Sequence, residues 1–81
     1  MHPDTLTMEQ LHQAVALIEG AGADPWELFL RVACVMEKWG ARYVVSVKMP
    51  EKVAGVTVWM TGQGDCPLEA CMRAYLKSRA G

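Results

Sequence analysis

Apolar residues near the start of the chain recur at helical spacing. Leu11, Val15 and Ile18 follow one another at intervals of four and three residues, which places them on one side of a helix. Thr7, with a glutamine three residues later, matches the capping box that starts many helices, and a glycine follows Glu19 where a helix would end. This pattern predicts a helix over Met8–Glu19.

A second helical pattern begins at Asp24 and Pro25. Aspartate is a favoured N-cap, and proline fits the first helical position because its missing N–H has no partner to lose there. Four apolar residues then form one stripe at helical spacing: Leu28, Val32, Val35 and Trp39. The pattern predicts a helix from Pro25 to about Trp39 that stops at Gly40, and we expect Trp26 and Phe29 to lie in the core.

From Arg42 onward the period of the pattern changes to two. Val45 and Val47 alternate with polar residues in a run rich in β-branched side chains, which predicts a strand over Arg42–Met49. A proline and a glycine interrupt the run, and a second alternating stretch predicts a strand over Gly55–Thr61. Together the two runs predict an antiparallel hairpin with a longer loop.

The last segment predicts a third helix that starts at Pro67, after a turn containing two glycines. Its predicted buried stripe consists of Leu68, Met72, Tyr75 and Leu76. Its predicted outer face consists of Glu69, Arg73 and Lys77.

The order of elements is therefore helix, helix, strand, strand, helix. We predict a single α+β domain over residues 1–81, in which helices cover an antiparallel β-hairpin. A two-stranded sheet is marginal in water, and exposed strand edges invite further pairing. We therefore expect a homodimer with the hairpin edges or Trp59 at the contact.

Composition narrows the function classes. The chain is 52% hydrophobic and 21% charged, which is typical of a folded domain, and its three cysteines show no metal-ligand spacing. No apolar run is long enough to span a bilayer, and the start lacks the features of a signal peptide, so we expect a soluble cytoplasmic protein without a membrane partner. No grouping of residues predicts a catalytic, metal or cofactor site. We expect a protein that is not an enzyme.

The last third of the chain resembles a family of small phage-encoded proteins of unknown function. The stretch "PLEACMRAYLKSRAG", after a glycine-containing turn and a strand, is similar to the C-terminal signature of the NinX-like family, also called the phage α/β/α (ABA) sandwich domain. The matching residues are Pro67, Leu68, Ala70, Met72, Arg73, Tyr75 and Ser78. The resemblance covers some 30 residues, implies a phage accessory protein in the cytoplasm of a host cell, and carries no catalytic residues.

Charge is distributed unevenly along the chain. Residues 1–37 carry six acidic residues against one basic residue, and residues 38–81 carry seven basic residues against three acidic ones. The two halves could attract each other, be solvated separately, or offer oppositely charged surfaces to partners.

From these observations we expect a protein that acts stoichiometrically by binding another host or phage protein. Inhibition of a host-defence system, in the manner of an anti-CRISPR protein, is the most concrete version, with a basic nucleic-acid-binding effector as the partner. The predicted contact residues are Glu9, Glu19, Asp24, Glu27, Glu37 and Trp59.

Binding to nucleic acid is the alternative. A basic face on the hairpin and the last helix, near an exposed aromatic ring, would suit a single strand. The predicted residues for this alternative are Arg42, Lys48, Arg73 and Lys77.

Overall fold

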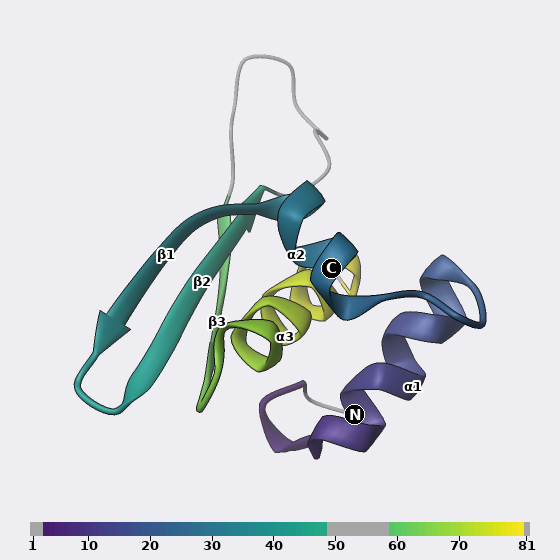
Figure 1. Cartoon of the computed structure of the whole chain (residues 1–81), viewed down its shortest axis with the longest axis horizontal. Coiled ribbons are helices and arrows are strands. Elements are labelled where there is room, and N and C mark those ends of the chain that lie inside the picture. The colour runs from purple at the N-terminus through teal and green to yellow at the C-terminus, as the bar shows by residue number, and fades with distance from the viewer. Residues whose placement is uncertain (1–2, 49–58, 81) are drawn as a thin grey trace.

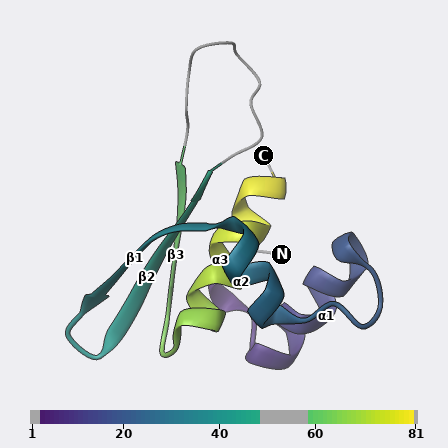
Figure 2. The ribbon, with the colours of Figure 1, turned by 45° about the horizontal axis from the view of Figure 1, so that its top comes forward.

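A three-stranded antiparallel sheet, with helices on one of its faces, forms the framework of the computed structural model (Figures 1 and 2). The structure describes residues 3–48 and 59–80. The elements are a short 3-10 helix η1 (Pro3–Thr5), α1 (Met8–Glu19), α2 (Pro25–Val32), β1 (Ala33–Trp39), β2 (Arg42–Lys48), β3 (Trp59–Gly64) and α3 (Pro67–Ala80). The predicted α+β class is confirmed, as is the packing of a hairpin against helices.

The first helix and its cap agree with the sequence. Thr7 Oγ1 accepts a hydrogen bond from the backbone N–H of Gln10, whose side chain in turn accepts one from the N–H of Thr7. Leu11 and Val15 are buried, whereas Ile18 is largely exposed. The cap therefore fixes where α1 begins, and two of the three predicted stripe residues reach the core.

The second predicted helix is wrong beyond Val32. Residues Ala33–Trp39 form strand β1, which pairs antiparallel with β2. Gly40, at φ 64°, begins a two-residue turn that brings Arg42 opposite Trp39. A helix reaching Trp39 would leave one edge of β2 unpaired, and the strand satisfies that edge instead.

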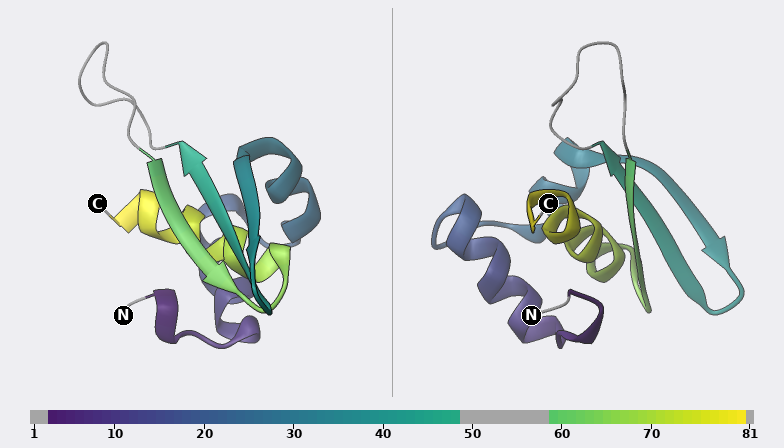
Figure 3. Two further views of the ribbon diagram at one scale, coloured as in Figure 1. Left: turned by 90° about the vertical axis from the view of Figure 1, so that its left-hand side faces the viewer. Right: turned by 180° about the vertical axis from the view of Figure 1, so that it is seen from behind.

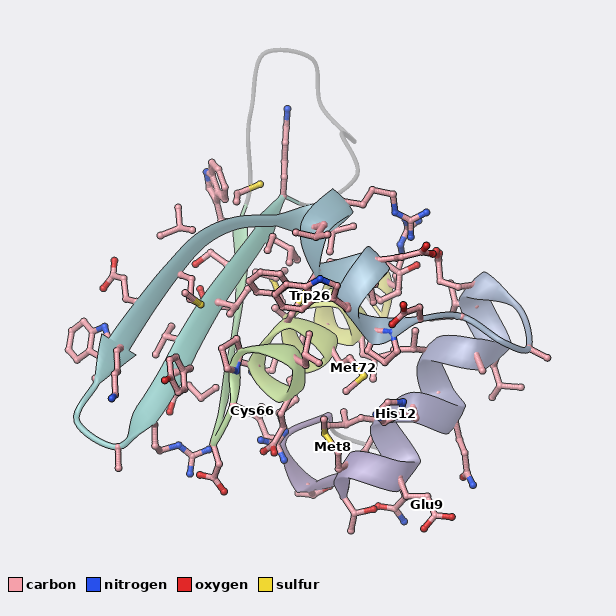
Figure 4. All side chains as sticks on the ribbon, in the orientation of Figure 1. Met8, Glu9, His12, Trp26, Cys66 and Met72 are labelled. Atoms are coloured by element: carbon pink, nitrogen blue, oxygen red, sulfur yellow. The ribbon has the colours of Figure 1, made fainter. Side chains whose placement is uncertain are left out.

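Most of the residues predicted to be buried in this segment are therefore exposed or only partly buried. Val35 and Trp39 are exposed on β1, and only Leu28 of the predicted stripe is fully buried. Trp26 is 51% exposed, contrary to the prediction, and its ring stacks on Phe29 with centroids 5.3 Å apart. Figure 4 shows Trp26 on α2, above α3 in that view.

The predicted hairpin corresponds to β2 and β3. The two strands pair antiparallel from Tyr43 opposite Gly64 to Lys48 opposite Trp59. Strand β3 continues past the predicted end at Thr61 to Gly64. Met49 and residues 55–58 of the predicted strands lie outside the described residues.

Helix α3 is the central element of the molecule. It lies between the sheet on one side and α1 and α2 on the other (Figure 3). One core cluster joins α3 to the other helices: Leu6, Leu11, Val15, Leu28, Met72, Tyr75 and Leu76. A second cluster joins it to the sheet: Val45, Val47, Ala70, Cys71 and Ala74.

Glycines in β3 allow α3 to approach the sheet closely. A Cβ atom on Gly62 would collide with the backbone of Ala70 and Ala74, and one on Gly64 would lie 2.8 Å from the backbone nitrogen of Ala70. Glycine in a strand often marks such a close approach of two backbones. The small residues of α3 therefore face the residues of β3 that have no side chain.

The predicted outer face of α3 is wrong, because the helix is enclosed on that side as well. Arg73 is only 9% exposed. Its guanidinium donates to the carbonyl oxygen of Gln63 at 2.7 Å and to that of Leu6 at 3.0 Å, and it also binds the Glu69 carboxylate. This side of α3 connects β3 to the N-terminal segment.

Candidate binding face

The face of the sheet opposite α3 is uncovered in the described part of the chain. The left view of Figure 3 shows the strands in front of α3, with no helix crossing them. Every second side chain along each strand lies on this face: Val35, Glu37 and Trp39 on β1, Arg42, Val44, Ser46 and Lys48 on β2, and Trp59, Thr61 and Gln63 on β3. We call this surface the open face.

Two tryptophans stand at opposite corners of the open face. Trp39 is 67% exposed at the end of β1, and Trp59 is 48% exposed at the start of β3. Val35, at 45%, adds a third large apolar side chain. Exposed aromatic rings in an uncovered sheet are unusual enough to suggest a binding role.

A basic residue stands opposite each tryptophan across the ladder. Arg42 pairs with Trp39, and Lys48 pairs with Trp59. The indole Nε1–H of Trp39 donates to a carboxylate oxygen of Glu37 at 2.8 Å, which orients the ring along its strand. The open face therefore combines aromatic rings, both signs of charge and neutral polar groups.

The centre of the open face is hollowed. A depression of about 310 Å³ is lined by Val35, Glu37, Trp39, Val44, Ser46, Thr61 and Gln63. The hydroxyls of Ser46 and Thr61 lie 3.2 Å apart on its floor. The volume is at the low end for small-molecule pockets, which also enclose most of their ligand, so the depression suits a protruding side chain of a partner better than a buried cofactor.

The predicted acidic contact residues do not form one surface. Figure 4 shows Glu9 projecting from α1 away from the rest of the molecule, whereas Glu37 lies on the open face. Glu19, Asp24 and Glu27 line a separate hollow between α1 and α2, together with Arg31.

Three of these acidic residues, Glu19, Asp24 and Glu37, have hydrogen-bond partners. Arg31 binds the carboxylate of Glu19, and the hydroxyl of Tyr75 donates to the same carboxylate. These two hydrogen bonds, the one from Arg31 foremost, lower the pKa of Glu19. Asp24 caps α2 by accepting from the N–H of Trp26 at 3.0 Å. Glu9 and Glu27 are exposed on α1 and α2, and Glu37, exposed on β1, accepts the hydrogen bond from Trp39.

The predicted basic residues divide into two pairs. Arg42 and Lys48 lie on the open face. Arg73 is buried, and Lys77 forms an ion pair with Asp4 at 2.9 Å and donates to the carbonyl oxygen of Thr61 at 3.1 Å. The contact between Asp4 and Lys77 also shows that the acidic and basic halves of the chain attract each other at this point.

The three cysteines differ in their surroundings. Burial raises the pKa of the Cys71 thiol to about 11, so it stays protonated at neutral pH. Cys34 is exposed on β1, and Cys66 is half-buried before α3. Among residues 3–48 and 59–80, no three His, Cys, Asp or Glu side chains gather as metal ligands would.

No family model, curated protein or solved structure matches the chain. The resemblance to the NinX-like phage family stays a prediction. In the described segments, none of the helices is long and apolar enough to cross a membrane.

The open face contains functional candidates that the sequence pattern concealed. Trp59 was predicted as a contact residue, but Trp39 and Val35 were assigned to a helical core stripe. One signal could have identified them, because the two residues Gly40 and Ala41 separate two runs rich in apolar residues, which is the spacing of a tight β-hairpin.

Proposed function

We propose that this protein is a non-enzymatic binding protein that holds another protein against the open face of its sheet. One observation carries the proposal: Trp39, Trp59 and Val35 are all exposed on a sheet face that no other described element covers. Tryptophan is the residue type most enriched among the contacts that dominate binding energy in protein interfaces.

The arrangement of polar groups supports a protein partner. Valine side chains and neutral hydroxyls lie in the middle, around the depression, while Glu37, Arg42 and Lys48 carry both signs of charge. Protein interfaces combine apolar and polar area in this way, and tryptophan and arginine are enriched in them.

The sequence resemblance supplies a biological setting for this proposal. A phage accessory protein that binds a component of a host-defence system, in the manner of an anti-CRISPR protein, would act stoichiometrically in the host cytoplasm. If that component is a basic nucleic-acid-binding effector, the carboxylate of Glu37 lies on the open face itself, whereas that of Glu27 lies on α2.

A single-stranded nucleic acid is the second candidate, and a specific observation favours it. Each exposed tryptophan of the open face has a basic residue opposite it, Arg42 beside Trp39 and Lys48 beside Trp59. Stacking of bases on aromatic rings together with contacts from basic side chains to phosphates is how sequence-tolerant single-strand binders work.

Affinity isolation with matched tryptophan variants tests the proposal. Tagged wild-type protein, the double variant Trp39→Ala with Trp59→Ala, and Trp26→Ala would each be incubated with nuclease-treated host lysate. Trp26 is exposed to a similar degree but lies on α2, outside the open face, so it is a matched control. We expect a captured protein that is lost only with the double variant. A captured protein that all three forms retain would contradict the proposal.

A titration with oligothymidylate distinguishes a nucleic-acid partner from a protein partner. Binding that quenches tryptophan fluorescence, weakens steeply as salt rises and is lost in Arg42→Ala with Lys48→Ala would favour nucleic acid over a protein partner. Under the protein proposal we expect no such binding.

A further inference from the structure

The two edges of the sheet differ in whether side chains from other elements bind their outward backbone groups. On β3, the outward backbone carbonyls of Thr61 and Gln63 accept hydrogen bonds from Lys77 and Arg73 of α3. These two long basic side chains therefore close the β3 edge to a further strand.

The β1 edge has no such cover. Successive residues of an antiparallel strand point their backbone N–H and C=O groups to opposite sides. Because those of Thr61 and Gln63 point outward from β3, the residues opposite them on β2, Val44 and Ser46, point theirs toward β1. There they pair with Glu37 and Val35. The backbone groups of Met36 and Lys38 consequently point away from the sheet. Within the described residues, no hydrogen bond to these groups is found outside the strand ladder.

Apolar side chains gather around this uncovered edge. Among residues 3–48 and 59–80, five of the eight exposed large hydrophobic residues belong to α2 and β1: Trp26, Leu30, Val35, Met36 and Trp39. Leu30, Val35 and Met36 also line a hollow at the junction of the two elements. Exposed apolar side chains beside an unpaired strand edge invite pairing with another chain.

We propose that β1 is the interface of a homodimer, in which the β1 strands of two copies pair antiparallel and form one continuous six-stranded sheet. This inference does not depend on the identity of any other partner. The sequence-based expectation placed a dimer contact at the edges of the hairpin or at Trp59, but β1 pairs with one of those edges and Arg73 and Lys77 of α3 bind the other.

The register follows from which backbone groups are free. β1 is irregular between Ala33 and Val35, so Met36 and Lys38 are the residues of the regular strand that offer outward groups. The register that pairs Met36 of each copy with Lys38 of the other uses all of these groups and places the two-fold axis at Glu37.

This register brings complementary side chains together. On the open face, Val35 of each copy stands opposite Trp39 of the other, an aromatic and β-branched pair of the kind that stabilises sheets. On the helix side, Met36 meets the aliphatic stem of Lys38, next to the hollow at the α2 and β1 junction. A second copy thus lies beside the exposed apolar residues of β1, in the plane of the sheet, and does not lie over the open face.

The same register places Glu37 opposite Glu37 of the second copy. Like charges directly opposite each other weaken a ladder, and the hydrogen bond from Trp39 turns each carboxylate along its own strand. Glu37→Gln should therefore tighten the dimer about three- to fivefold.

Sedimentation equilibrium of the full chain over a range of concentrations tests the proposal. We expect reversible association of the 8.9 kDa chain into a dimer. Met36→Pro removes an N–H that the monomer does not use, so it should weaken association at least about tenfold while circular dichroism stays unchanged. A wild-type chain that stays monomeric at its highest soluble concentration would overturn the inference, as would a dimer that Met36→Pro leaves intact.

Cysteine cross-linking provides a readout that stands even if the proline variant does not fold. In a Cys34→Ser background, Glu37→Cys should form an intermolecular disulfide, because opposed residues of this type have Cα atoms about 4.5 Å apart. Gln63→Cys, on the closed β3 edge, is the matched control and should not cross-link. A disulfide through residue 63 and none through residue 37 would place the contact on the other edge or across the open faces, and would refute the β1 interface.

Discussion

On one face of the sheet, glycine and valine meet α3 at a separation that leaves no room for a side chain at Gly62. On the other face, tryptophan, threonine and glutamine stand with no described element over them. The two faces belong to the same strands, and their residues alternate along the chain. Along each strand, one set of alternate residues packs against α3 and stabilises the fold, and the other set forms the proposed binding face.

Gly62 should give the largest effect on stability. Gly62→Ala places a methyl group against the backbone of α3, which cannot move without separating the helix from the sheet. We expect a loss of at least about 3 kcal/mol in the free energy of unfolding, measured by urea denaturation. Gln63→Ala, one residue away on the open face, should change it by less than about 0.5 kcal/mol. Equal losses would mean that both faces are packed.

Arg73 should give the next largest effect. Arg73→Met keeps the aliphatic stem but leaves the carbonyl oxygens of Gln63 and Leu6 without this donor. We expect a loss of about 2 to 3 kcal/mol in thermal or urea unfolding. Arg42→Met, on the open face, is the control and should cost less than about 0.5 kcal/mol. An Arg73→Met variant with an unchanged free energy of unfolding would contradict the enclosed position of this side chain.

The contact of Glu19 with Arg31 and Tyr75 should give a smaller effect that depends on pH. Its pKa is lowered in the folded protein, so its contribution is present above the ordinary value of 4.5 and is lost as pH falls below it. Melting temperatures measured from pH 6 to pH 3 should therefore fall less steeply for Glu19→Gln than for the wild type. Parallel curves would show that this carboxylate has no stabilising partner.

The sequence predicts the parts of this fold that local chemistry determines. The capping box at Thr7, the Asp24-Pro25 start and the alternation from Tyr43 to Val47 each specify an element without reference to the rest of the chain. Helix α1, the start of α2 and the strand β2 are confirmed, and so is the α+β class.

The errors arise where tertiary contacts decide between two local possibilities. The apolar residues from Val32 to Trp39 fit a helical stripe as well as a strand, and pairing with β2 selects the strand. The amphipathic pattern of α3 similarly predicts an outer face, but the N-terminal segment and β3 enclose it through Arg73 and Lys77. Because the open face depends on β1, its composition could be predicted only in part, through Glu37, Trp59, Arg42 and Lys48.

The most direct test of the proposed binding face uses the three tryptophans as probes in one experiment. Each indole N–H gives its own signal in a ¹⁵N–¹H correlation spectrum of the labelled protein. During titration with the purified protein captured from lysate, the signals of Trp39 and Trp59 should shift or broaden, while that of Trp26 on α2 should stay in place. A titration in which the Trp26 signal responds and the signals of Trp39 and Trp59 do not would contradict binding through the open face.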